Sequence, residues 1–165
     1  MAYSGEGVAA LVSIIDELQT VNLILADKKV KELLKCLAFY PEFRTVLGHV
    51  NKGFDYQTEK RKALQKVGEH NVLRLPKNDK QFVALIMGML VEMDAGSMDL
   101  LSFTRNYFPA TTGQESLDLF VSKVVEPFKY ALVNMVVNGI KEEQVLVERT
   151  VDFAPSGLGE QVKNI

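Results

Sequence analysis

Two aspartates and a serine surround a glycine in the stretch VEMDAGSMDLLSFTRNYFP, a composition found in metal-binding and catalytic loops. A calcium loop of the helix–loop–helix type needs oxygen ligands at positions 1, 3, 5 and 12, with glycine at position 6. Counted from Asp94, position 3 is Gly96 and position 12 is an arginine, so the ligand pattern fails. We expect a structural corner instead: Gly96 ends one helix and Ser97 caps the next, with Asp99 in its first turn.

Two histidines and one cysteine are the other residues with clear catalytic or metal-binding chemistry. His49 and His70 belong to no His-x-x-x-His, Glu-x-x-His or His-x-Glu pattern, so the helical zinc and di-iron signatures are absent. The chain also lacks a Gly-x-Ser-x-Gly elbow, a dinucleotide-binding glycine motif and a Walker A motif. Cys36 lies in an apolar periodic segment, where a buried and unreactive thiol is expected. We therefore predict no catalytic residue, no cofactor and no metal site.

Length and composition are those of a globular protein. A chain of 165 residues fits one domain, and 47% hydrophobic with 24% charged residues are ordinary values. The longest apolar run, FVALIMGMLV, has ten residues, about half of the roughly 20 that span a bilayer. The single cysteine excludes an intrachain disulfide and favours a reducing compartment. We expect a cytoplasmic protein without a transmembrane segment.

Apolar residues recur at three- and four-residue steps along most of the chain, which predicts a mainly α-helical bundle of six or seven helices. Residues 82–93 are apolar almost all round, as in a helix buried at the middle of a bundle. Gly88 in this segment indicates the close approach of another backbone, since glycine lowers helix propensity. The expected helices cover about residues 7–25, 28–40, 41–50, 54–67, 80–94, 98–108 and 114–139.

Pro127 interrupts the last of these helices. Because proline cannot donate to the carbonyl of Lys123, the helix should bend or split there. A pocket near Pro127, made by this irregularity, would suit a small-molecule binder or an enzyme. This is one alternative function for the chain.

The apolar period changes from helical to alternating after residue 141, which predicts a strand. A single strand is not stable alone, so it must pair with residues 71–75, with its copy in a dimer, or with a partner. We expect residues 1–141 to form the helical bundle domain and residues 142–165 to form a strand or arm with a loose tail.

Aromatic and alternating apolar residues near the C-terminal half predict an interaction surface, if they exceed what the core can bury. We expect a non-enzymatic interaction or assembly protein that self-associates, with a homo-oligomer or another protein as partner. The candidate interface residues are Phe103, Tyr107, Phe108, Phe128, Val145, Val147, Val151 and Phe153.

Residues 58–80 are the most basic part of the chain, with seven Lys or Arg against three Asp or Glu. Such a segment can meet phosphates, which makes a nucleic-acid-associated regulator a further alternative. The segment has no interleaved aromatic residues and no helix-turn-helix pattern, and a solvated helix face would have the same composition. The candidate phosphate contacts are Lys60, Arg61, Lys62 and Lys66.

Overall fold

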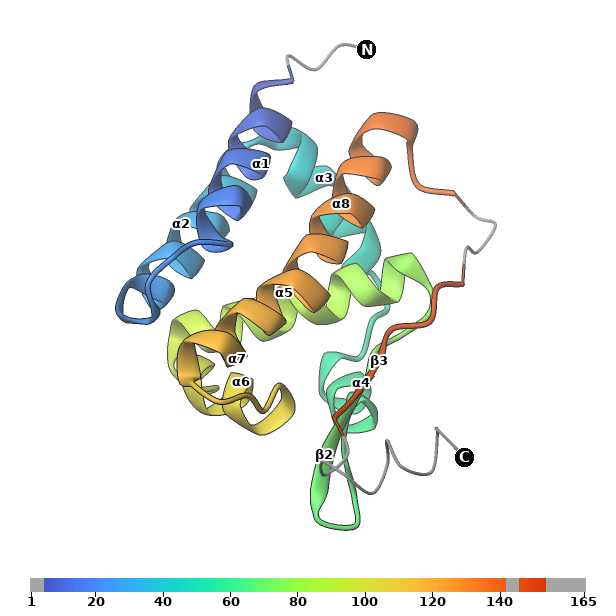
Figure 1. Cartoon of the computed structure of the whole chain (residues 1–165). Coiled ribbons are helices and arrows are strands. Elements are labelled where there is room, and N and C mark those ends of the chain that lie inside the picture. Colours follow the sequence, from blue (N-terminus) through green and yellow to red (C-terminus); the bar gives the residue numbers. More distant parts are fainter. Residues whose placement is uncertain (1–4, 142–145, 154–165) are drawn as a thin grey trace.

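The computed structural model describes residues 5–141 and 146–153, and its architecture is a mainly helical bundle with a small sheet at its C-terminal side (Figure 1). The predicted fold class is therefore confirmed. A short 3-10 turn, η1 (Leu23–Leu25), precedes the second helix. The α-helices are α1 (Glu6–Leu18), α2 (Ala26–Phe39), α3 (Pro41–Asn51), α4 (Tyr56–Ala63), α5 (Asp79–Ala95), α6 (Leu100–Tyr107), α7 (Gly113–Phe120) and α8 (Glu126–Asn138).

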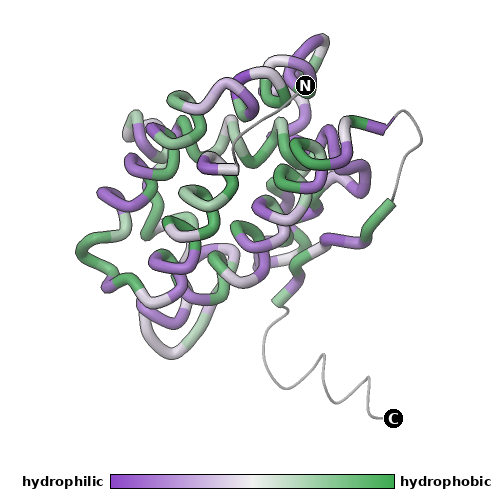
Figure 2. The backbone as a smooth tube through the Cα atoms, turned by 90° about the horizontal axis from the view of Figure 1, so that it is seen from above, coloured by the Kyte–Doolittle hydropathy of each residue, from purple (hydrophilic) through white to green (hydrophobic). Residues whose placement is uncertain are grey.

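Helix α5 lies at the centre of the bundle, and α2, α3, α4 and α8 pack against it (Figure 1). Hydrophobic and hydrophilic stretches alternate along the surrounding helices in Figure 2, as expected for helices with one buried face. The predicted buried helix at residues 82–93 is confirmed. Its buried residues are Phe82, Val83, Ala84, Leu85, Ile86, Met89, Leu90 and Met93.

Gly88 lies on α5 against the ring of Tyr56, the first residue of α4. A Cβ atom at this position would lie 2.4 Å from ring carbons Cδ1 and Cε1 of Tyr56. The close approach predicted from Gly88 therefore exists, but the neighbour is an aromatic side chain rather than another backbone. The absence of a side chain at Gly88 lets the Tyr56 ring lie against the central helix.

The corner between α5 and α6 has the expected form with a different cap. Gly96 ends α5 with a φ of 85°, as predicted. Asp99, not Ser97, is the N-cap of α6, because its carboxylate accepts from the backbone N–H of Ser102 at 2.9 Å. Ser97 lies two residues before this cap, and its hydroxyl hydrogen-bonds to the Glu92 carboxylate at 3.3 Å.

The sheet has three antiparallel strands in the order β1–β2–β3. They are β1 (Leu64–Val67), β2 (His70–Arg74) and β3 (Thr150–Asp152). The helix predicted for residues 54–67 is thus too long, because a turn at Gly68 with a φ of 63° folds β1 back onto β2. The C-terminal strand pairs within the chain, with Val151 opposite Leu73. Val145, predicted to belong to this strand, lies outside the described residues.

Pro127 marks a real interruption in the last predicted helix. A π-helical segment, η2 (Val121–Val125), separates α7 from α8, and Pro127 stands in the first turn of α8. A proline N–H is not required in a first turn, so the ring is accommodated where α8 begins. The helical backbone is continuous from α7 through η2 into α8, so the irregularity predicted near Pro127 is a π-helical segment rather than a split. Among the described residues, no helix is long and apolar enough to cross a membrane.

Candidate functional site

Residues 146–153, called the arm below, run beside α8 after the bundle is complete and end in the sheet (Figure 1). Between the arm and α8 lies an open groove, the arm groove, with a volume of about 620 Å³. It is located beside Pro127, where the sequence placed a pocket. The lining residues are Asp79, Ser122, Lys123, Pro127, Tyr130, Ala131, Asn134, Val147, Glu148, Arg149, Thr150 and Val151.

Arg149 is the main link between the arm and the bundle. Its guanidinium pairs with the carboxylate of Asp79, in the first turn of α5, and donates to the carbonyl of Pro76 at 3.2 Å. The side chain is only 9% exposed, and its carbon Cζ lies 4.0 Å from the centre of the Phe82 ring. Its Nε–H is buried and has no acceptor among the described residues.

Glu148 links the exposed side of the arm to Lys77 of the bundle. Its carboxylate accepts from the Oγ1 of Thr150 at 2.7 Å and the backbone N–H of Thr150 at 3.1 Å, and it pairs with Lys77 at 3.2 Å. These contacts lower the pKa of Glu148 from 4.5 to about 2, the Thr150 hydroxyl contributing most. Glu148 is therefore ionised over the whole physiological range.

Two further contacts complete the attachment. The backbone N–H of Val147 donates to the carbonyl of Lys77 at 2.9 Å, and the Nε2 of His70 lies 2.8 Å from a carboxylate oxygen of Asp152. Together with the ladder between β2 and β3, these contacts fix the wall of the arm groove to the bundle.

The charges along the arm groove do not cancel completely. Asp79 is matched by Arg149, and Glu148 is matched by Lys77. Lys123 is exposed and has no carboxylate partner among the described residues. The groove therefore offers one free ammonium group beside an apolar wall.

A second groove, called the α7 groove, shares the lining residue Ser122 with the arm groove. It has a volume of about 680 Å³. Glu115 and Asp118 give it two carboxylates, and none of its lining residues is Lys or Arg. Glu115 completes a capping box with Thr112, while Asp118 accepts from the amide of Gln114 at 3.1 Å. The remaining lining residues are Gln19, Ala110, Thr111 and Leu119.

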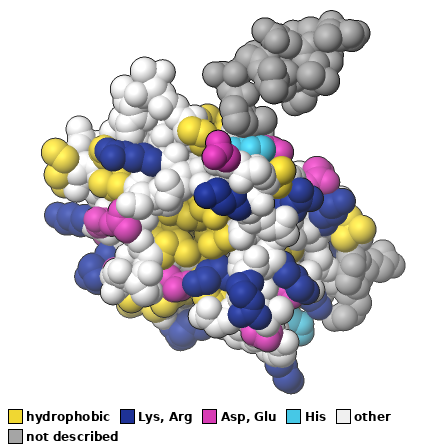
Figure 3. Space-filling model, turned by 90° about the horizontal axis from the view of Figure 1, so that it is seen from below, with side chains coloured by type: hydrophobic (Ala, Val, Ile, Leu, Met, Phe, Trp, Pro, Cys, Tyr) yellow, Lys and Arg dark blue, Asp and Glu magenta, His cyan; other side chains and the backbone are white. Residues whose placement is uncertain are grey.

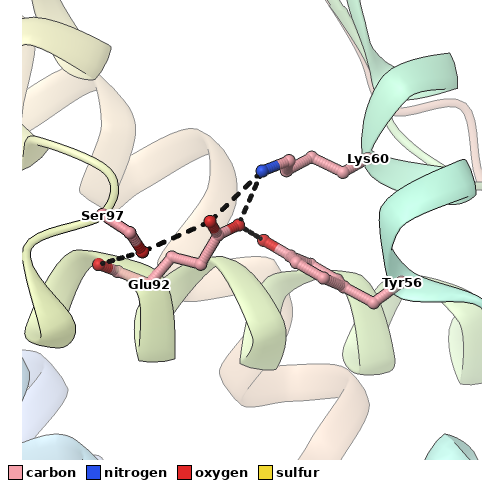
Figure 4. Close-up of polar contacts among 4 residues, drawn as sticks. All are labelled: Tyr56, Lys60, Glu92 and Ser97. Carbon is pink, nitrogen blue, oxygen red and sulfur yellow. Dashed lines mark hydrogen bonds and ion pairs between the residues drawn. The ribbon is translucent and has the colours of Figure 1, made fainter.

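A polar cluster on the other side of α5 joins α4 to the central helix (Figure 4). The Glu92 carboxylate accepts from the Tyr56 hydroxyl, from the Lys60 ammonium at 2.9 Å and from the Ser97 hydroxyl at 3.3 Å. Burial alone would raise the pKa of Glu92, but the hydrogen bonds from Tyr56 and Lys60 outweigh it and lower the pKa. Burial and the bond to Glu92 raise the pKa of the Tyr56 hydroxyl, which stays protonated. The cluster fastens two helices and leaves no free base.

Lys60, a predicted phosphate contact, pairs with Glu92 in this cluster. Its side chain is 21% exposed and its ammonium is committed to Glu92. Arg61, Lys62 and Lys66 are exposed, and Lys62 pairs with Glu59 on the same helix at 3.3 Å. On the face seen in Figure 3, Lys and Arg side chains are interspersed with acidic and apolar ones. That face has no continuous basic stripe.

The predicted aromatic surface lies largely in the core. Phe103, Phe108 and Phe128 are buried in the hydrophobic core. Phe103 stacks on the half-buried Tyr107, with ring centres 5.0 Å apart. Phe108 contacts Phe153 of the arm, with ring centres 6.0 Å apart. Phe108 therefore helps to attach the arm to the bundle, and the three buried phenylalanines do not form an exposed surface.

Val147 and Val151 are the two predicted interface valines that the structure describes, and they lie in different environments. Val151 is buried in the sheet, whereas Val147 is 41% exposed and lines the arm groove. The most exposed aromatic side chain there is Tyr130, which was not among the predicted interface residues, with 65% exposure. Its place three residues after Pro127, near the predicted pocket, was the one available signal in the sequence.

Cys36 has no features of a nucleophile. It is buried, and burial raises the pKa of its thiol to about 11, so it stays protonated. Within residues 5–141 and 146–153, no group of three or more His, Cys, Asp or Glu side chains is placed to hold a metal ion.

Comparison with known proteins gives no relative. No protein-family model, no curated protein and no solved structure matches the chain.

Proposed function

We propose that this protein is a non-enzymatic interaction protein, and that a segment of another protein chain lies extended in the arm groove. One observation carries the proposal. Strand β3 has β2 on one side and no further strand among the described residues on the other, and it borders the groove. An edge strand beside an apolar wall is the arrangement by which proteins bind extended segments through strand addition.

The side chains of the groove support binding rather than catalysis. Tyr130 and Val147 supply exposed apolar area, and aromatic side chains dominate the energetics of protein interfaces. The carboxylates of Asp79 and Glu148 are held by cations, so neither is available as a general base.

Self-association is the homodimeric form of the same proposal. Two copies related by a two-fold axis would place one β3 antiparallel to the other, since such an interface uses the same patch twice. The partner segment is then the arm of a second copy. We further propose a cytoplasmic location, supported by the lone reduced thiol of Cys36.

Sedimentation velocity tests the homodimeric form. We expect the mass to rise from monomer to dimer between micromolar and millimolar concentration. The changes Tyr130→Ala and Val147→Lys should return the chain to a monomer, because they remove apolar contacts and add a charge. Phe39→Ala is the matched control, since Phe39 is 72% exposed on α2, outside the groove. A monomer at every concentration contradicts self-association.

Peptide selection tests the more general proposal. Short random peptides displayed on phage are selected against the protein, and binding of the selected peptides is mapped by backbone amide shifts. We expect shifts at α8 and the arm, with affinity about tenfold weaker in Tyr130→Ala and unchanged in Phe39→Ala. Shifts confined to other surfaces would contradict the proposal.

A small molecule in the arm groove is a second candidate function. The observation that favours it is the groove volume of about 620 Å³, which falls within the range of roughly 300–1,000 Å³ typical of ligand pockets. A fragment screen by ligand-observed NMR, repeated on Tyr130→Ala, separates this candidate from peptide binding.

A further inference from the structure

We propose that the arm groove and the α7 groove together bind one extended peptide that carries opposite charges a few residues apart. An acidic side chain of the peptide lies toward Lys123, and a basic side chain lies toward Asp118 and Glu115. This inference rests on the proposed function and adds the chemistry of the partner.

Ser122 lines both grooves, and we infer from this shared residue that one bound segment can follow them as a single path. One runs from Ser122 along α8 and the arm, and the other runs from Ser122 along α7 to Ala110. Their apolar residues, Tyr130 and Ala131 on one side and Leu119 on the other, can contact the middle of a bound segment. A partner that uses both grooves must therefore be long and extended.

The arm end of this path attracts a negative charge. The ion pairs of Asp79 with Arg149 and of Glu148 with Lys77 are internally balanced, which leaves the ammonium of Lys123.

The α7 end attracts a positive charge. Among residues 5–141 and 146–153, Asp118 and Glu115 accept hydrogen bonds only from neutral groups, namely Gln114 and Thr112. No Lys or Arg lines this groove. The sign of the uncompensated charge therefore reverses from one end of the path to the other.

The separation of the charges sets the pattern of the peptide. Lys123 follows Asp118 by five positions and Glu115 by eight along α7 and η2. At about 1.5 Å per helical residue, the two ends lie about 8–12 Å apart along the axis. An extended peptide advances about 3.3 Å per residue, so its basic and acidic residues should be about two to four positions apart.

Peptide selection against matched charge variants tests the inference. Short random peptides on phage are selected against the full-length protein, Lys123→Glu and Asp118→Lys. Asp118 is changed rather than Glu115 because Glu115 completes the capping box of α7. Wild-type protein should enrich peptides with a basic and an acidic residue at the predicted spacing. Lys123→Glu should lose the acidic preference and Asp118→Lys the basic one, each with about tenfold weaker binding of wild-type-selected peptides.

The outcomes separate the inference from the proposed function. Peptides that bind at the grooves without a charge preference, or with one that neither variant changes, overturn the inference and leave the proposed function intact. Peptides that bind elsewhere, or an absence of binders, overturn both. Unchanged circular dichroism spectra of the two variants confirm that loss of binding is not loss of folding.

Discussion

The guanidinium carbon of Arg149 lies 4.0 Å from the centre of the Phe82 ring. The same group pairs with Asp79, three positions before Phe82 on α5, so one arm residue contacts the central helix twice. A buried guanidinium that has both an aromatic face and a carboxylate is well compensated for its desolvation. The wall of the arm groove is thus anchored to the most buried helix of the bundle.

Removing this anchor should destabilise the fold measurably. Arg149→Ala deletes the ion pair, the ring contact and the bonds to the Pro76 and Lys77 carbonyls. We expect a loss of about 2–3 kcal/mol in the free energy of unfolding, measured by urea titration. Arg149→Lys should lose about half as much, because it keeps the charge without the planar fork. Lys77→Ala, which breaks an exposed pair, should cost under about 0.5 kcal/mol. Equal losses in all three variants would contradict this role.

Gly88 should be intolerant of alanine despite its place in a helix. Alanine has a helix propensity about 1 kcal/mol better than glycine, so an open site would be stabilised. A Cβ at residue 88 would instead lie 2.4 Å from the Tyr56 ring and displace it from Glu92. We expect Gly88→Ala to lower the free energy of unfolding by about 2 kcal/mol, measured by urea titration.

A double-mutant cycle isolates the cause. In a Tyr56→Ala background the ring is gone, and Gly88→Ala should then stabilise the protein by up to about 1 kcal/mol. The change of sign identifies steric conflict with Tyr56. If Gly88→Ala destabilises both backgrounds equally, another contact is responsible.

The sequence predicted most of the bundle because the buried face of a helix is visible as a local periodicity of apolar residues. Residues 82–93 and the irregular helix near Pro127 are examples, since each depends on neighbours in the chain and on simple stereochemistry. The sequence did not predict strand β1, because LQKV lacks an alternating apolar pattern. This segment is a strand because it pairs with β2, a tertiary contact that strand propensity alone does not indicate.

The candidate site was less predictable for the same reason. Arg149 and Asp79 are 70 positions apart, and Tyr56 and Glu92 are 36 apart, so no local pattern links them. The basic segment, residues 58–80, shows a second limit of sequence-based prediction. Its composition predicts phosphate contacts, but composition cannot reveal that Lys60 is paired with Glu92.

Lys60 and Lys62 should therefore differ sharply when each is changed to alanine. Lys60→Ala leaves the largely buried Glu92 without its cation, and we expect a loss of about 1–3 kcal/mol in the free energy of unfolding. Lys62 is 68% exposed, and its pair with Glu59 should contribute under about 0.5 kcal/mol. Thermal and urea unfolding of the two variants provides the comparison. Similar small effects would show that the Glu92 cluster does not fasten α4.

Glu148 should titrate far below an ordinary glutamate. The hydroxyl and backbone N–H of Thr150, with Lys77, favour its charged form and lower its pKa from 4.5 to about 2. Because the folded pKa lies below the unfolded one, the stability that Glu148 contributes is fully present above about pH 4.5 and is lost as the pH falls toward 2. Carboxyl carbon shifts measured by NMR against pH should therefore give a midpoint near 2 for Glu148.

Variants of Thr150 and Lys77 show which contact lowers the pKa of Glu148 most. Thr150→Val removes the hydroxyl, the largest contribution, and should raise the midpoint of Glu148 more than Lys77→Ala does. The stability difference between wild type and Glu148→Gln should shrink over the same window, because both side chains are then neutral in the folded state. A wild-type midpoint near 4.5 would mean that Glu148 makes none of these contacts in solution and that the outer side of the arm is not held by its carboxylate.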